Sequence, residues 1–232
     1  QMDGCDALFH TATVYSTSGD ATVIIDTANK GTQHLFTAAN ECGIKRIVYT
    51  SSIAAVGSMP KGREKNEDDW QTDRSSPYTI AKTESERLAW DLAKQLDLDL
   101  RVINPSGVLG GGFVKPTPSV EWFDDAMKGL FPAAPKIPMA FVHVIDVAIA
   151  HRKAYEIDEA QGRFILAPHN NTTIAAVCRR IRELHPKTKS PKRAIPVSLM
   201  FIVVFQDWAM SWFGAPRRMT RRAVKGYFRG DS

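Results

Sequence analysis

The chain alternates short apolar segments with amphipathic segments of helical length, and this alternation constrains the fold more than any other feature. Apolar runs typical of buried strands occupy residues 6–13, 46–52 and 98–104. Residues 20–39 and 78–95 repeat apolar side chains at helical spacing, with Gly43 expected to end the first helix and Ser76 to cap the second. Strands joined by helices of this length form βαβ units. The sequence therefore predicts an α/β fold with a doubly wound parallel sheet.

The texture changes after Pro105, where glycines and prolines recur. Shorter elements are expected at residues 140–144, 146–156, 163–167 and 172–184, alternating strand and helix. We expect Asp146 to be the N-cap of the second of these. Residues 1–107 then form the sheet domain and residues 108–232 a smaller substrate lobe, of which a segment at about 140–157 returns to the sheet.

Composition and charge narrow the class of protein. Apolar residues make up 44% and charged residues 24% of the 232, as in ordinary globular proteins. The net charge of +5 is uneven, because residues 179–232 carry 13 basic and three acidic side chains while the remainder is acidic. Three scattered cysteines predict neither a disulfide framework nor a metal site, which favours a reducing, cytoplasmic setting. No export signal is visible.

A tyrosine and a lysine open the second expected helix at positions that share one face. Tyr78 and Lys82 are four residues apart. A phenol with a pKa near 10 is a poor acid or base at neutral pH unless a cation stabilises its phenolate. Lys82 supplies such a cation, although an isolated pair at this spacing is more often an ordinary helix face.

The surroundings of this pair resemble a known family. Ser52 ends the preceding strand, at the sheet edge where ligands bind in open α/β folds. A strand ending YTSS, a YxxxK helix, a PSGVLG loop and the segment FVHVIDVAIAH follow one another in this order. The chain is similar to extended short-chain dehydrogenase/reductases of the NAD-dependent epimerase/dehydratase type, and to their dihydroflavonol-4-reductase-like branch.

The resemblance implies a Rossmann-type fold, a nicotinamide cofactor and a small-molecule substrate. Tyr78 would be the acid/base, Lys82 would bind the cofactor ribose and lower the tyrosine pKa, and Ser52 would orient the substrate oxygen. The cofactor-lining positions implied, besides Tyr78 and Lys82, are Thr11, Ala12, Thr13, Pro105, Ser106 and Val108. Hydride transfer at a carbinol or carbonyl carbon follows, with NAD or NADP as the donor and the reductase-like branch favouring NADP.

The glycine-rich phosphate loop of the family is the main departure. No GxxGxxG follows a first strand, and the glycines at 107–112 precede Pro116 and Pro118, which we expect to exclude a following helix. The first strands of the Rossmann half are thus expected to be missing from this chain, which alone should bind dinucleotide weakly and be inactive. A nucleotide-sugar epimerase/dehydratase, and a non-catalytic or membrane-peripheral protein on the same fold, remain as alternatives.

Several other features are better explained by packing than by function. His10 and His143 are expected to be hydrogen-bonded structural histidines, and Cys178 to be core. Residues 195–229 combine an apolar run with basic residues, which would suit contact with a membrane surface, yet internal packing is the preferred interpretation. No nucleic-acid module is recognisable, so no nucleic-acid partner is expected.

Overall fold

The computed structural model describes residues 2–12, 20–57, 63–74, 76–112, 118–168 and 172–196, with isolated positions 199, 205 and 212. The predictions for Thr13 and for nearly all of residues 197–229 lie outside this described part. The chain divides into two compact units, residues 1–108 with 142–167 and residues 109–141 with 168–232. Among the described residues, no helix combines the length and apolarity needed to cross a bilayer.

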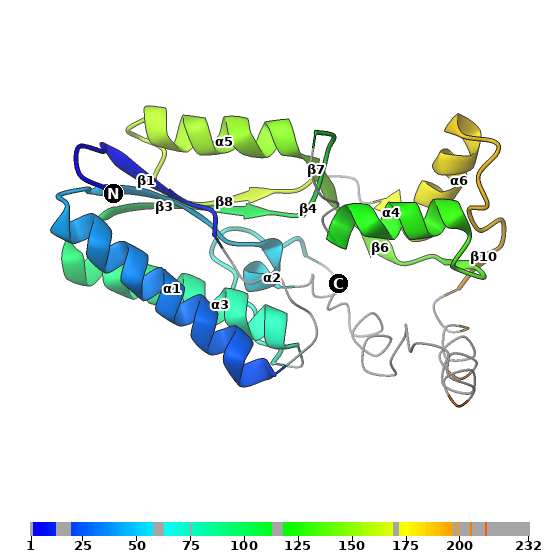
Figure 1. Ribbon diagram of the computed structural model, residues 1–232, viewed down its shortest axis with the longest axis horizontal. Helices are drawn as coiled ribbons and strands as arrows, with labels where there is room; N and C mark the ends of the chain where they lie inside the picture. Colours follow the sequence, from blue (N-terminus) through cyan, green and yellow to red (C-terminus); the bar gives the residue numbers. More distant parts are fainter. Residues whose placement is uncertain are drawn as a thin grey trace. The chain divides into compact units, whose positions relative to one another are not determined.

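The first unit is built on four parallel strands in the order β1-β2-β3-β8, as Figure 1 shows. Their bounds are β1 Ala7–His10, β2 Arg46–Thr50, β3 Asp99–Pro105 and β8 Gly162–Leu166. The register pairs His10 with Tyr49, Thr50 with Ile103 and Pro105 with Leu166. The predicted parallel α/β sheet is confirmed.

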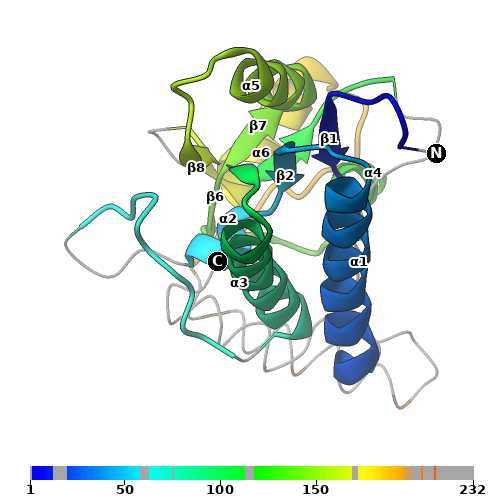
Figure 2. The same cartoon turned by 90° about the vertical axis from the view of Figure 1, so that its left-hand side faces the viewer.

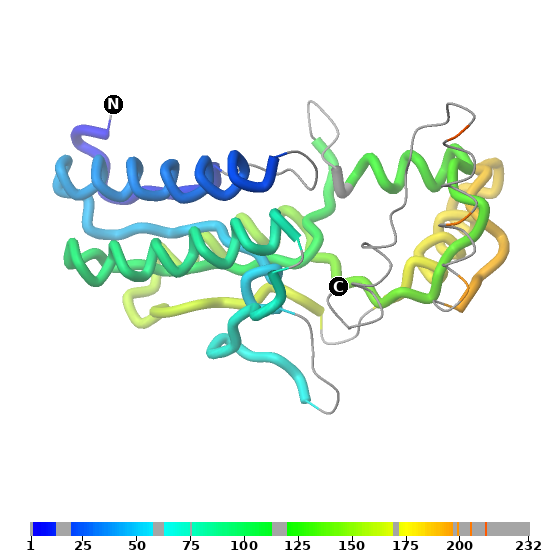
Figure 3. The backbone as a smooth tube through the Cα atoms, turned by 90° about the horizontal axis from the view of Figure 1, so that it is seen from below, coloured from blue at the N-terminus to red at the C-terminus, as the bar shows by residue number. Residues whose placement is uncertain are grey.

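Helices cover both faces of this sheet. Helices α1 (Ala21–Glu41) and α3 (Pro77–Leu96) lie side by side on one face, and α5 (Val144–Glu156) lies on the other (Figures 1, 2 and 3). Because side chains alternate along a strand, Ile47 and Tyr49 of β2 pack under α1 and α3, whereas Val48 packs toward α5. Phe36 of α1 is fully buried in the larger of these two layers.

The ends of the first helix follow from its sequence. The Asp20 Oδ1 atom accepts a hydrogen bond from the Thr22 N–H at 2.8 Å, which satisfies one of the free amides of the first turn. The helix ends at Glu41, and Gly43 adopts a φ of +74°, a conformation that glycine reaches without steric cost. The predicted stop at Gly43 is confirmed.

The second unit contains shorter elements, some of which straddle its limits. In chain order they are α4 Pro118–Lys128, β5 Ala134–Pro135, β6 Pro138–Met139, β9 Thr172–Thr173, α6 Ile174–Leu184 and β10 Ala194–Ile195. The strands β4 Gly107–Leu109 and β7 Phe141–His143 each have two of their three residues in the first unit. β5 pairs in parallel with β10, β6 antiparallel with β9, and β4 with β7. Cys178 and Ile181 of α6 are buried with Ala126 of α4, so the prediction that Cys178 is core is confirmed.

Two local predictions are wrong. A helix, α4, does follow the glycines, because Pro118 occupies its first turn, where a proline displaces no intrahelical hydrogen bond. Asp146 is not the N-cap of α5, since that helix begins two residues earlier. His143 is the N-cap, and its Nδ1 atom accepts from the Ile145 N–H at 3.3 Å. Asp146 instead lies in the first turn, where a carboxylate is favoured by the helix dipole.

Candidate active site

The carboxyl ends of the four parallel strands gather polar residues at one edge of the sheet. Thr11 and Ala12 follow β1 and are exposed, Ser51 and Ser52 follow β2, and Ser106 follows β3. Ligands of open α/β sheets bind outside this edge, because the loops that leave the strands converge there. The register of the strands therefore brings most of the predicted site residues to the same side of the first unit.

Helix α3 carries Tyr78 and Lys82 toward this edge. The helix begins at Pro77 with Ser76 in the N-cap position, so Tyr78 lies in the first turn, at the positive end of the helix dipole. Lys82 is one turn further along and only 4% exposed. Its ammonium donates a hydrogen bond of 3.5 Å to the carbonyl oxygen of Thr50, the last residue of β2. The lysine is thus directed at the strand end that carries Ser52.

The protonation equilibrium of Lys82 is shifted by two opposing causes. Burial lowers its pKa to about 8, while the nearby carboxylate of Glu86 raises the pKa and limits that fall. At pH 7 the ammonium is still the major form. A buried cation four residues from a phenol on the same helix face stabilises the phenolate form of that phenol.

Ser52 caps a helix and presents its hydroxyl group directly after β2. It is the N-cap of the short helix α2 (Ile53–Val56), and its Oγ atom accepts from the Ala54 N–H at 3.1 Å. A serine hydroxyl has one proton to donate besides its lone pairs. The cap uses a lone pair, so the O–H proton remains available to a substrate oxygen.

Buried polar atoms near the same edge lack a hydrogen-bond partner among the described residues. They are the hydroxyl oxygen of Ser106, the side-chain oxygen of Asn104 and both ring nitrogens of His10. Buried polar groups are nearly always paired, so these atoms mark the carboxyl end of the sheet as a place with unused hydrogen-bonding capacity. His10 is buried as predicted, but neither ring nitrogen makes the predicted hydrogen bond with any described residue. Burial, together with the charge of Lys82, lowers the pKa of His10 to about 4.

A buried carboxylate beneath the site was not anticipated from the sequence. Glu86 of α3 is fully buried, and its oxygens accept hydrogen bonds from Ser51 Oγ at 2.5 Å, Asn104 Nδ2 at 2.8 Å and Arg163 Nε at 2.6 Å. Its spacing from Tyr78 and Lys82, at successive intervals of four, was the available signal, because such positions share one helix face.

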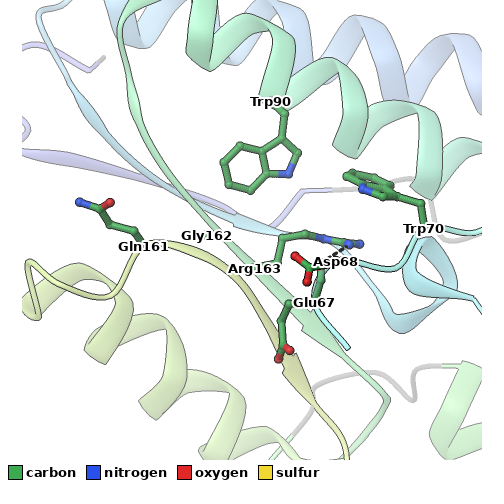
Figure 4. Close-up of a pocket in the computed structure, with 7 residues that line it drawn as sticks. All are labelled: Glu67, Asp68, Trp70, Trp90, Gln161, Gly162 and Arg163. Atoms are coloured by element: carbon green, nitrogen blue, oxygen red, sulfur yellow. Dashed lines mark hydrogen bonds between the residues drawn. The ribbon is translucent and has the colours of Figure 1, made fainter. Parts of the chain in front are cut away.

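A hollow of the described surface lies away from the predicted catalytic residues. It has a volume of about 460 Å³ and is drawn in Figure 4, with Trp90 of α3 on one side and Trp70 and Arg163 beside it. Its lining includes none of Ser52, Tyr78 and Lys82. Of the other predicted positions, Pro105 is buried in β3 and Val108 is half-buried in β4.

Comparison with known proteins places the chain in a family. A sequence model of the NAD dependent epimerase/dehydratase family matches residues 1–166. The chain is 31% identical over 205 residues to cinnamoyl-CoA reductase 2 of Medicago truncatula, an alignment that covers 81% of this chain and 59% of that protein. The chain thus spans about three fifths of the length of this curated relative.

Solved structures share the fold over nearly the whole chain. The crystal structure of gox2253 superposes with a TM-score of 0.78 at 27% identity, covering 97% of this chain and 68% of that one. UDP-glucose 4-epimerase of Thermus thermophilus, in complex with NAD, gives a TM-score of 0.68 at 19% identity, covering 98% of this chain and 78% of that one. These similarities confirm the predicted Rossmann-type architecture.

Proposed function

Because the chain belongs to the NAD dependent epimerase/dehydratase family, we propose that it forms part of an NAD(P)-dependent oxidoreductase that reduces a carbonyl to a carbinol, or the reverse. The observation that carries this proposal is the placement of Tyr78 one helical turn before the buried Lys82. The ammonium of Lys82 donates to the carbonyl oxygen of Thr50, the residue at which β2 ends, two positions before Ser52. The similarity to a reductase supports reduction, whereas the similarity to the epimerase reported above is at the level of the fold.

The residues at the carboxyl edge suit a dinucleotide cofactor. Lys82 and Tyr78 would hold the hydroxyls of its nicotinamide ribose. Thr11 to Thr13 would line it after β1, and Pro105, Ser106 and Val108 would line its nicotinamide end. When bound, the cofactor supplies or accepts a hydride at the substrate carbon.

Side chains of the protein then bind the substrate oxygen and exchange a proton with it. The hydroxyl group of Ser52 donates a hydrogen bond to the substrate oxygen, and this bond fixes the orientation of the carbonyl. Tyr78 gives its phenolic proton to that oxygen during reduction and recovers a proton from it during oxidation. Lys82 stabilises the phenolate that Tyr78 becomes, because its positive charge is held in a buried setting where solvent screens it little.

The test is Tyr78→Phe in the full-length gene product, with Tyr155→Phe on α5 as the matched control. Loss of the acid/base should lower carbonyl turnover by at least about a hundredfold. Cofactor affinity should change by only a few fold, since the ring and Lys82 remain. The control removes a phenolic hydroxyl away from the site and should keep near-wild-type turnover. Near-wild-type turnover of Tyr78→Phe would contradict the proposal, and analysis of products from nucleotide sugars would reveal an epimerase.

A further inference from the structure

Glu86 is a buried carboxylate whose hydrogen bonds reach strands β3 and β8 and the turn that follows β2. Its carboxylate bonds Ser51, which adjoins Ser52, and Asn104 near the end of β3. The same Asn104 amide also donates to the Ser52 carbonyl oxygen at 3.1 Å. The turn that presents the Ser52 hydroxyl is therefore held to Glu86 through two neighbouring contacts.

The same carboxylate acts on Lys82. Glu86 follows Lys82 by one turn on the inner face of α3, and both side chains are buried. Among the described charged groups of the first unit, Glu86 is the one whose charge raises the Lys82 pKa against the effect of burial. Two of the three proposed catalytic residues thus depend on one carboxylate that itself lies below the sheet edge.

Arg163 fixes the position of this carboxylate. Its Nε atom donates to Glu86 Oε1 at 2.6 Å. The guanidinium also lies 4.0 Å from the centre of the Trp70 ring, and Figure 4 shows these two side chains next to each other. A second guanidinium nitrogen donates to the carbonyl oxygens of Glu67 and Asp69, in the segment that leads to Tyr78. An arginine held by this many contacts keeps the Glu86 carboxylate at one position, because guanidinium–carboxylate hydrogen bonds are strong and directional.

We propose that Glu86 is a positioning residue for the reaction, which holds the turn of Ser52 through Ser51 and Asn104 and places its carboxylate one helical turn from Lys82. This inference rests on the proposed function. It assigns to Glu86 no contact with substrate or cofactor, and it predicts that loss of the charge changes the pH range in which the enzyme works.

Other titratable groups surround the pair on the neighbouring elements. They are Tyr78 on α3, His10 at the end of β1, Tyr49 on β2, Arg163 on β8, His151 on α5 (whose ring bonds the Thr50 hydroxyl) and, beyond Arg163, Glu67 and Asp69. His10 and His151 both have lowered pKa values because they are buried, so neither supplies a positive charge near pH 8. Asp69 is already paired with Arg63. The phenol of Tyr78 can also lose its proton at alkaline pH, so the labelled Lys82 signal, rather than the alkaline limb of turnover alone, identifies the lysine equilibrium.

The experiment measures the Lys82 pKa directly in the full-length gene product. The protein carries lysine labelled with ¹³C at Cε, and the Lys82 signal is assigned by its loss in Lys82→Arg. In Glu86→Gln the pKa should fall by about one unit. The alkaline limb of the turnover profile should move by the same amount, so that turnover at pH 8.5 drops about eightfold beyond any loss at pH 6.

Two further variants separate positioning from folding. Removing one partner of a buried ion pair can unfold a protein, so Glu86→Gln/Arg163→Gln, which leaves no unpaired charge, is measured as well. Its Lys82 pKa should also fall. Arg101→Met is the matched control, because Arg101 is equally buried but bonds Asp99 and carbonyl oxygens at the end of α5. It should lower the unfolding temperature without moving the pKa or the profile.

The outcomes are distinct. A lowered Lys82 pKa with a shifted profile supports the proposal. An unchanged Lys82 pKa in both Glu86 variants overturns it, whatever happens to stability. If the wild-type protein turns over no carbonyl substrate, the proposed function fails, while the labelled lysine still decides whether Glu86 sets the charge of Lys82.

Discussion

His10 should make the first unit sensitive to mild acid. The ring is 4% exposed, lies 5.0 Å from the Tyr49 ring between centres, and has no hydrogen-bond partner for either nitrogen among the described residues. Burial, with a smaller contribution from the Lys82 charge, lowers its pKa from 6.5 to about 4. A protonated imidazole is therefore unfavourable in the folded protein.

The sign and size of the effect follow from this pKa. The unfolded chain takes up the proton as the pH falls through 6.5, whereas the folded protein takes it up only near 4, so stability is lost across that window and is retained above it. Between pH 7.5 and pH 4.5 the loss due to His10 amounts to about 2.5 kcal/mol. In urea this corresponds to a shift of about 1 M in the midpoint.

The assay is urea unfolding of wild type and His10→Phe, followed by circular dichroism at pH 7.5 and pH 4.5. Phenylalanine keeps an aromatic ring beside Tyr49 and Phe36 but has no proton to bind. The variant should lose about 2.5 kcal/mol less than wild type on acidification. The exposed His34 of α1 provides the control, since His34→Gln should behave as wild type. If acidification lowers the free energy of unfolding equally in His10→Phe and wild type, His10 is not the source of the acid sensitivity.

Three further variants test the packing of the first unit by thermal or urea unfolding. Arg101→Met should cost about 3 to 5 kcal/mol, because it strips the donors from Asp99 and from the carbonyl oxygens of Ala154 and Ile157; a loss below about 1 kcal/mol would show that these contacts are dispensable. Phe36→Ala should lower the free energy of unfolding by about 3 to 5 kcal/mol because of the cavity it leaves. An unfolding midpoint equal to that of wild type would argue against the buried position of Phe36. Gly57→Ala should cost about 1 to 3 kcal/mol, because φ is +94° and the new Cβ would lie 2.9 Å from the Lys65 ammonium; unchanged stability would disprove that strain.

The sheet and its covering helices were predictable because their signals are local. Apolar runs such as that of β2, and helix limits such as Asp20 and Gly43, specify elements without reference to distant residues. The parallel pairing followed from the lengths of the intervening helices. Tyr78, Lys82 and Ser52 were found because the residues around them resemble a family.

The remainder depends on contacts that the sequence does not display. Helix α5 begins after His143, which is its N-cap, although aspartate is by preference the better N-cap residue. Strand β7 ends at His143, so the helix begins directly after that strand and not at Asp146. Helix α4 is not evident from the sequence, because proline usually interrupts a helix. Pro118 is the first residue of α4, a position where proline is tolerated. Glu86 was passed over because a glutamate on a helix is usually exposed, and only the fold brings Arg163 and Asn104 to it.

The proposed centre of Ser52, Tyr78 and Lys82 should support hydride transfer to a carbonyl carbon. The most direct test incubates the full-length gene product with NADPH or NADH deuterated at the transferable position and with a panel of carbonyl substrates that includes ketones, aldehydes and thioesters. Mass spectrometry should find deuterium on the reduced carbon of the product with wild type, and none above background with Tyr78→Phe. Equal deuterium incorporation by the two proteins, or none by wild type with any carbonyl substrate, would contradict the account.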